Sequence, residues 1–209
     1  MGCALAGYNL RVLPIVWAAV LAASPALPLA DVARAIPDAV IDLRYATSEN
    51  ALGRAVYPSA ARCLLLPAVA VRLSRAADRL RAQGLRLRLW DCYRPVAVQR
   101  ELWQRLPRRG FVADPARGGS NHNRAAGVDV AVAAADGGPI ALPTEFDSFD
   151  RRARADASQG VSSAARRNRD RLRAAMEAEG FRVNRMEWWH FDAPEARGAP
   201  VLDVPLVAR

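Results

Sequence analysis

The stretch that most constrains the fold is a helix-like segment that runs directly into a strictly alternating one. Apolar residues recur at helical spacing over residues 66–83, and Gly84 ends the pattern. The sequence LRLRLW follows, with leucine at every second position and Arg86, Arg88 and Trp90 between the leucines. Such alternation is typical of a β-strand with one face in the core and the other half exposed to water.

The other predicted elements follow no regular alternation of strands and helices. Residues 95–106 and 164–180 have helical spacing; the first begins at a proline and the second ends at a glycine. Residues 127–138 predict a second strand that ends in an Asp-Gly-Gly turn, and residues 181–191 predict a last, aromatic-rich strand. We therefore expect an α+β fold, with a small, largely antiparallel sheet and helices packed against it, as a single domain over residues 31–209.

The first thirty residues have the order of a secretory signal peptide. Arg11 is their only charged side chain, and an uncharged run over residues 12–30 ends among small residues. An uncleaved membrane anchor is the alternative, because a run of this length could nearly span a bilayer. Its three prolines and alanine-rich end favour cleavage. We expect residues 1–30 to be removed, leaving an exported, periplasmic protein without a stable membrane span.

Export bears on Cys63 and Cys92, the two cysteines of the expected mature chain. An even cysteine count in an oxidising compartment predicts a disulfide. The bond would close a loop of about thirty residues and contribute roughly 3–4 kcal/mol in the chain-entropy model. Two buried, unpaired thiols are the alternative. The spacing is not that of a CxxC zinc or redox motif.

The chain is strongly basic, with a net charge of +9, and all 30 of its basic residues are arginines. They are scattered at helical and strand spacings, whereas a nucleic-acid binder more often clusters basic residues, includes lysines and interleaves aromatic residues. We therefore expect no nucleic-acid partner. The charge would favour acidic surroundings such as a cell wall or an anionic membrane surface.

The chain contains only 2 histidines, and each lies near a carboxylate. His122 stands in a Gly/Asn-rich loop before Asp129, and His190 follows Glu187 in the sequence MEWWHF. Two imidazoles and one or two carboxylates are what a catalytic zinc site needs, with one position left for water. A nearby glutamate can take a proton from that water. A core histidine packed beside two tryptophans is the alternative for His190.

Spacing leaves open which carboxylate is the ligand. In a regular strand Glu187 and His190 would point to opposite faces, and in a helix they would share one. A local bend could let both reach one site, walled by Trp188 and Trp189. Ser120 lacks the G-x-S-x-G setting of a serine nucleophile.

Together these motifs resemble the zinc D-alanyl-D-alanine dipeptidases, the vancomycin-resistance type of cell-wall dipeptidase. The motifs are, in chain order, IDLRYATSEN with Gly53 and Tyr57, WDCYRP, Ser120-x-His122 with Asp129, PTEFDSFD, and MEAEGF before EWWHF. The resemblance covers nearly the whole expected mature chain.

The resemblance implies one zinc ion per chain, bound by His122, Asp129 and His190. Glu187 would be the general base and later the acid, and Arg94 would stabilise the oxyanion of the tetrahedral intermediate. The residues that would contact the two ends of the dipeptide are Tyr45, Ser120 and Asp147, with Asp147 facing the ammonium group.

Some residues depart from the family pattern. Ala125 and Gly127 stand where Gly and then Ala are usual, Ala51 where Phe is usual, and Pro143 where Gly is usual. None of these changes replaces a chemical group, but they bear on substrate preference.

The resemblance therefore predicts hydrolysis of the small dipeptide D-Ala-D-Ala to two D-Ala in cell-wall peptide turnover. One alternative is a zinc D,D-carboxypeptidase that acts on peptidoglycan stem peptides. Another is a non-catalytic wall-binding module, against which the intact Glu187 and Arg94 argue. Oligomeric state does not follow from the sequence.

Overall fold

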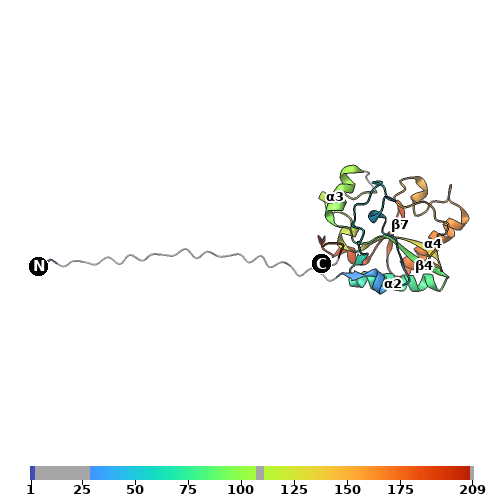
Figure 1. Cartoon of the computed structure of the whole chain (residues 1–209), viewed down its shortest axis with the longest axis horizontal. Coiled ribbons are helices and arrows are strands. Elements are labelled where there is room, and N and C mark those ends of the chain that lie inside the picture. The colour runs from blue at the N-terminus through green and yellow to red at the C-terminus, as the bar shows by residue number, and fades with distance from the viewer. Residues whose placement is uncertain (3–28, 107–110, 208–209) are drawn as a thin grey trace.

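The computed structural model describes residues 1–2, 29–106 and 111–207 (Figure 1). Apart from its two ends, the predicted signal peptide lies outside the described residues. Within the described part of the chain, no helix has the length and apolar character needed to cross a membrane.

The strands of the described chain form one main sheet and one small sheet. The main sheet has the strand order β2 (Val40–Ile41), β4 (Leu85–Asp91), β5 (Gly127–Ala134), β7 (Glu187–Asp192) and β6 (Arg182–Asn184). β2 pairs with β4 in parallel, and the other neighbours pair antiparallel. The small sheet pairs β1 (Ala30–Asp31) with β3 (Leu64–Leu65), also antiparallel. The prediction of a largely antiparallel α+β fold is confirmed.

The three helices that spacing predicted are present, and one further, short α-helix of the described chain was not predicted. The α-helices are α1 (Val32–Ala35), α2 (Pro67–Arg81), α3 (Val96–Arg105) and α4 (Ser163–Ala178). Short 3₁₀ helices lie between them: η1 (Arg44–Ala46), η2 (Pro115–Arg117), η3 (Asn121–Arg124), η4 (Arg151–Ala153) and η5 (Pro194–Arg197). α2 and α4 pack on each other and on the sheet, and Figure 1 shows α3 on the opposite side of the sheet.

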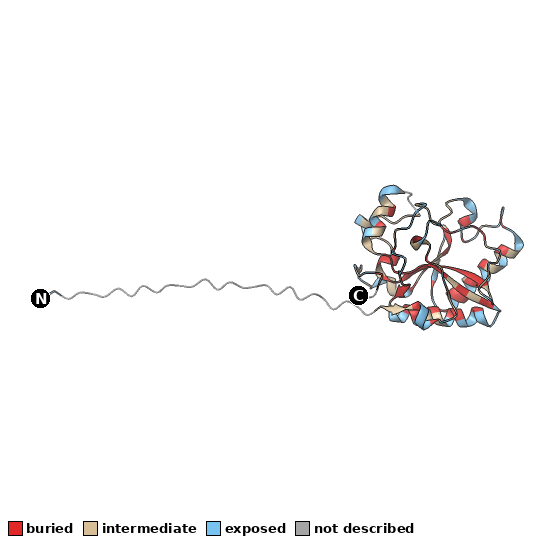
Figure 2. Ribbon diagram, in the orientation of Figure 1, coloured by how far each residue is buried: buried red, intermediate tan, exposed pale blue. Residues whose placement is uncertain are grey.

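The core lies between the main sheet and these helices (Figure 2). β5 is buried along nearly its whole length because strands flank it on both edges and its faces are covered. In β4, Leu85, Leu87 and Leu89 are buried as predicted, and Arg86 is half-buried.

The second face of β4 is less open to water than its alternation predicted. Trp90 is 1% exposed, because it packs with Phe146, Trp188 and Trp189 at ring-centroid distances of 5.5–6.5 Å. Arg86, Arg88 and Trp90 share this face of β4. Aromatic side chains from distant segments cover it at Trp90, whereas Arg88 remains half-buried. Of these aromatic side chains, Trp189 also lines the cavity of the candidate site.

The segment 181–191, predicted as one strand, is instead the hairpin β6–β7, with its turn at Arg185 and Met186. The side-chain oxygen of Asn184 accepts a hydrogen bond from the main-chain N–H of Met186 at 3.0 Å. Asparagine side chains commonly form such turns two residues on. The single-strand prediction was wrong because this asparagine was read as part of the strand.

Candidate active site

The three predicted metal ligands come from three elements that the sheet brings together. Asp129 on β5 and His190 on β7 are directly opposite each other in the antiparallel pair, so their side chains share one face. His122 lies on η3, immediately before β5. The chain reverses after η3 at Ala125, whose φ of 53° is left-handed, and this turn returns His122 to the same face.

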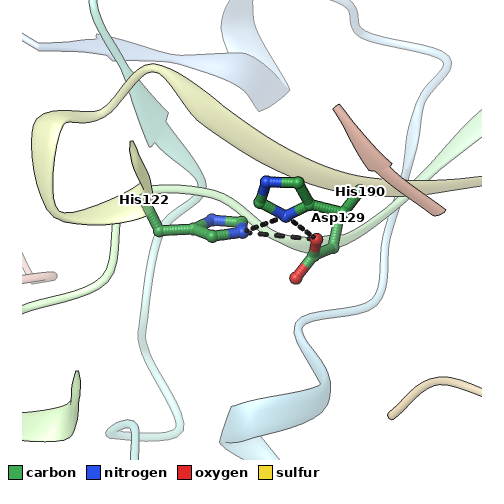
Figure 3. Close-up of side chains that lie close together, drawn as sticks. All are labelled: His122, Asp129 and His190. Carbon is green, nitrogen blue, oxygen red and sulfur yellow. Dashed lines mark hydrogen bonds and ion pairs between the residues drawn. The ribbon is translucent and has the colours of Figure 1, made fainter. Parts of the chain in front are cut away.

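The donor atoms of these residues converge (Figure 3). Nδ1 of His190 lies 2.9 Å from Oδ1 of Asp129, and Nε2 of His122 lies 3.2 Å from the same oxygen. The two ring nitrogens are 3.1 Å apart. All three donor atoms lie within 4.8 Å of one another, which is the arrangement of a group that could hold a metal ion.

The outer nitrogens of both imidazoles have acceptors. Nδ1 of His122 donates to the carbonyl oxygen of Cys92 at 2.6 Å, and Nε2 of His190 donates to Oδ1 of Asp192 at 3.0 Å. These acceptors place a proton on each outer nitrogen and leave the inner ones able to offer lone pairs. Two imidazole nitrogens with fixed tautomers and one carboxylate oxygen form a donor set that suits a divalent metal ion.

The charges around this group also favour a cation. Burial disfavours the charged form of His190, yet Asp129 and Asp192 hold its pKa well above the ordinary value. Burial also opposes ionisation of Asp129, but His122 and His190 outweigh it and hold the pKa of Asp129 below its usual range. The pocket therefore attracts positive charge, as a proton or as a metal ion.

Glu187 lies at the start of β7, where the β6–β7 register shifts. Its Oε2 accepts a hydrogen bond from Nδ2 of Asn184 at 2.9 Å. Burial raises the pKa of Glu187 to about 8; Asp129 adds to this effect, and His190 opposes it. Although strand alternation would separate Glu187 from His190, both line one cavity.

Arg94 is held firmly at the wall of this cavity. It follows β4, is 7% exposed, and donates through Nε and Nη2 to Oδ2 of Asp91 at 2.9 and 2.7 Å. Its Nη1 donates to Oε1 of Gln99 at 2.9 Å, and its Nη2 lies 3.7 Å from Oδ2 of Asp129. The guanidinium carbon lies 4.9 Å from the centre of the Tyr45 ring. These contacts fix a positive charge beside the candidate metal ligands.

Tyr45 and Asp147 are in direct contact. The Tyr45 hydroxyl and the main-chain N–H of Ala51 each donate to Oδ2 of Asp147 at 3.0 Å. Burial raises the pKa of Asp147 to about 6. Ser120 is the N-cap of η3, and its hydroxyl oxygen accepts from the main-chain N–H of His122 at 3.2 Å. Ser120 thus supports the loop of a candidate ligand.

The predicted site residues all line one cavity of about 320 Å³. They are Tyr45, Arg94, Ser120, His122, Asp129, Asp147, Glu187 and His190. Apolar side chains line the same space, including Leu102, Phe111 and Trp189. Trp189 thus walls the cavity as predicted, whereas Trp188 is buried and donates from Nε1 to Oγ1 of Thr144 at 3.0 Å.

Four supporting side chains were not predicted from the sequence: Asp91, Gln99, Asn184 and Asp192. Asp192 carried a usable signal, because residues two apart in a strand share a face and Asp192 follows His190 by two. Gln99 carried none, since its role depends on how α3 meets the loop at Ala113, whose carbonyl oxygen it also binds at 2.7 Å.

Comparisons with known proteins agree on one family. A family model described as D-ala-D-ala dipeptidase matches residues 26–205. A protein of Escherichia coli strain K12 named D-alanyl-D-alanine dipeptidase is 37% identical over 174 residues, which cover 83% of this chain and 89% of that protein. Proteins of the same name from Streptomyces coelicolor and Enterococcus faecalis are 34% and 30% identical. Their matches cover 74% and 72% of this chain and 85% and 83% of those proteins.

Proposed function

The chain belongs to the D-Ala-D-Ala dipeptidase family of metallopeptidases, and on this basis we propose that it hydrolyses D-alanyl-D-alanine to two molecules of D-alanine. The observation that carries the proposal is the convergence of three donor atoms, a buried glutamate and a fixed arginine on one cavity. A binding module would need neither a proton acceptor nor an oxyanion donor at the same place.

The proposed cofactor is one zinc ion, held by Nε2 of His122, Oδ1 of Asp129 and Nδ1 of His190. The mixed imidazole and carboxylate donor set supports zinc over magnesium or calcium, which prefer oxygen ligands. A bound zinc ion would polarise the scissile carbonyl and lower the pKa of a water molecule in its fourth position.

Glu187 is the proposed general base and acid. Burial raises the pKa of this carboxyl group in the metal-free protein. The charge of a bound zinc ion would lower it again, so that the ionised group can accept a proton from water and return it to the leaving amine. The hydrogen bond from Asn184 fixes one of its oxygens and thereby the direction of the other.

Arg94 is the proposed oxyanion donor. Charge on the carbonyl oxygen develops only toward the tetrahedral transition state, so a donor fixed beforehand favours that state over the substrate. Asp91 and Gln99 hold the guanidinium in place, and this removes the need to order it during the reaction.

Asp147 is the proposed partner of the substrate's free ammonium, with Tyr45 and Ser120 contacting the dipeptide. With a pKa of about 6, Asp147 is mostly ionised at neutral pH and can pair with a cationic amine. A carboxylate at the end of the site would favour a short substrate with a free amino terminus.

The test is hydrolysis of D-Ala-D-Ala by the purified protein, measured as D-Ala released, before and after dialysis against a chelator. We expect activity that the chelator removes and zinc restores. Glu187→Gln should lower turnover about 100-fold or more and retain zinc, because the glutamate is not a ligand. His190→Ala should lose both. Absence of zinc-dependent D-Ala release would contradict the proposal.

A zinc D,D-carboxypeptidase acting on stem peptides is the second candidate function. It is favoured by a second cavity of about 420 Å³ that shares Ala51 and Asp147 with the first. A peptide extended at its amino end could continue into this space. Comparing kcat/KM for D-Ala-D-Ala and for a pentapeptide ending in D-Ala-D-Ala separates the two functions, since a dipeptidase should cleave only the former.

We also propose that the protein is exported, to the periplasm or an equivalent compartment, and acts in wall turnover. The signal-like pattern of residues 1–30 supports this location, as does the bond between Cys63 and Cys92, because disulfides persist in oxidising compartments. Cell fractionation with an antibody against the protein tests the location, and recovery in the cytosolic fraction would reverse it.

A further inference from the structure

The predicted disulfide between Cys63 and Cys92 is present, and it lies beside the candidate metal centre. Cys92 directly follows β4, and Cys63 directly precedes β3. Both cysteines are 1% exposed, and the bond joins positions 29 residues apart in the chain. The disulfide therefore attaches the segment that leads from β4 into the site to the residue before β3.

This segment, residues 92–94, contacts His122 through its main chain. The carbonyl oxygen of Cys92 accepts the hydrogen bond from Nδ1 of His122 at 2.6 Å. The main-chain N–H of Arg94 donates to the carbonyl oxygen of His122 at 3.1 Å. The direction in which Nε2 of His122 points toward Asp129 (Figure 3) therefore depends on where residues 92–94 lie.

Beyond β4, residues 92–94 are tied to β3 and no longer to β5. The pairing of β4 with β5 ends at Asp91, after a register shift that follows Leu89. The main-chain N–H of Tyr93 then donates to the carbonyl oxygen of Leu64 at 3.0 Å. Cys92 precedes Tyr93 and Cys63 precedes Leu64, so the disulfide lies directly beside this hydrogen bond. The two links together hold residues 92–94 against β3.

We propose that the Cys63–Cys92 disulfide is a positioning element of the metal site, because it holds the Cys92 carbonyl where His122 needs an acceptor. The inference rests on the proposed metal site. Acceptors behind metal-binding histidines fix the tautomer and the ring orientation, and their loss typically weakens metal binding about 10- to 100-fold. The disulfide acts one step further out, on the residue that supplies the acceptor.

The test compares the zinc affinity of the wild-type protein with that of the double variant Cys63→Ala/Cys92→Val. Valine keeps the main-chain carbonyl and an apolar side chain, so the change removes the tether and not the acceptor. Affinity is measured by competition with a chromophoric chelator, at a temperature where circular dichroism shows both proteins folded. We expect the variant to bind zinc about 10-fold more weakly.

Reduction of the wild-type disulfide with a phosphine, removed before the titration, gives an independent measurement if the variant does not fold. It should produce the same loss of affinity. Leu80→Ala is the matched control, because Leu80 is fully buried on α2 and no residue of α2 lines the site cavity. Figure 1 shows α2 on the side of the sheet opposite to α3, which contributes Leu102 to that cavity. It should lower the melting temperature and leave zinc affinity unchanged.

The outcomes separate this inference from the proposed function. If the wild-type protein binds zinc and both tether-free forms bind it equally tightly, the disulfide has only a stabilising role and the inference is wrong. Equal weakening in Leu80→Ala would also overturn it, because any loss of stability would then suffice. If the wild-type protein binds no zinc, the proposed metal site fails and the inference with it.

Discussion

At the residue scale, the position of His122 depends on a missing side chain at residue 127. A Cβ added to Gly127 would lie 2.9 Å from the main-chain nitrogen of His122 and 3.1 Å from the carbonyl carbon of Asn121. Both are backbone atoms, which cannot move aside without moving η3. At Ala125 the situation is reversed, because a side chain is present where the backbone favours glycine. Its φ of 53° is a left-handed conformation that costs a residue with a Cβ about 1–2 kcal/mol.

Gly127→Ala should therefore destabilise the protein by about 1–3 kcal/mol, the usual cost of overpacking, and weaken zinc binding because η3 must shift. Urea unfolding and chelator competition measure the two effects. Gly198→Ala is the matched control, since its Cβ would meet nothing within 4 Å and its φ is −117°. Equal behaviour of the two variants would contradict the role assigned to Gly127.

Ala51 bears on substrate length, because it lines both the site cavity and the second cavity. Ala51→Phe should fill space where the two cavities meet, while its main-chain N–H still donates to Asp147. We expect kcat/KM to fall at least about tenfold more for a peptide extended at its amino end than for D-Ala-D-Ala. Ala51→Ser, of similar size, should leave the ratio unchanged. An unchanged ratio in the phenylalanine variant would show that substrates do not pass residue 51.

At the element scale, the β5–β7–β6 ribbon sets the chemistry of the site. The pairing of Asp129 with His190 fixes the register of β7, and a slip of one residue would turn His190 to the opposite face. The β6–β7 turn then brings Asn184 beside Glu187. Asn184 serves both purposes, since its oxygen closes the turn and its amide nitrogen donates to the glutamate.

The hydrogen bond from Asn184 favours the ionised form of Glu187, so its removal should raise the pKa of that carboxyl group. In Asn184→Ala the acidic limb of the pH profile of kcat/KM should shift to higher pH. Asn184→Asp should shift it further, because it keeps the oxygen that closes the turn but adds a second negative charge. If the acidic limb lies at the same pH in the wild type and both variants, it does not reflect the ionisation of Glu187.

At the scale of the whole molecule, the site concentrates buried charge on one side of the sheet, while apolar helix packing covers the other. Asp91, Arg94, Asp129 and Glu187 are each less than 9% exposed. Buried carboxyl groups cost folding free energy unless they are paired or neutral. Asp91 and Asp129 have cationic partners, whereas burial keeps Glu187 protonated up to about pH 8.

The stability of the metal-free protein should therefore fall as pH rises from about 4.5 to about 8. Over this range the folded protein keeps a proton on Glu187 that the unfolded chain, with a pKa near 4.5, has lost. The slope from this group is at most about 1.4 kcal/mol per pH unit. Glu187→Gln removes it, so the variant should gain stability over the wild type at pH 8 relative to pH 5.

Urea unfolding of both metal-free proteins at pH 5 and pH 8 measures this difference. Asp147, whose pKa burial also raises, is present in both proteins, so the comparison isolates Glu187 together with its charge interaction with Asp147. A stability difference between the two proteins that is the same at both pH values would mean that Glu187 titrates alike in the folded and unfolded chain.

The sequence by itself determined the elements whose signals are local. Helical spacing and a terminal glycine defined α2 and α4, and alternation defined β4, because periodicity depends only on neighbouring residues. The scarcity of histidine, together with the motifs in their order, was enough to name the eight candidate site residues and the family. The signal-like pattern of residues 1–30 and the even cysteine count after it were enough to predict the Cys63–Cys92 disulfide.

Only the tertiary structure decided how these groups meet. It set Asp129, and not Glu187, opposite His190, and it assigned the inner nitrogen of each histidine through acceptors at Cys92 and Asp192. It also buried Trp90 and supplied Asp91 and Gln99 behind Arg94. These features depend on strand register and on contacts between distant segments, which no local pattern in the sequence encodes.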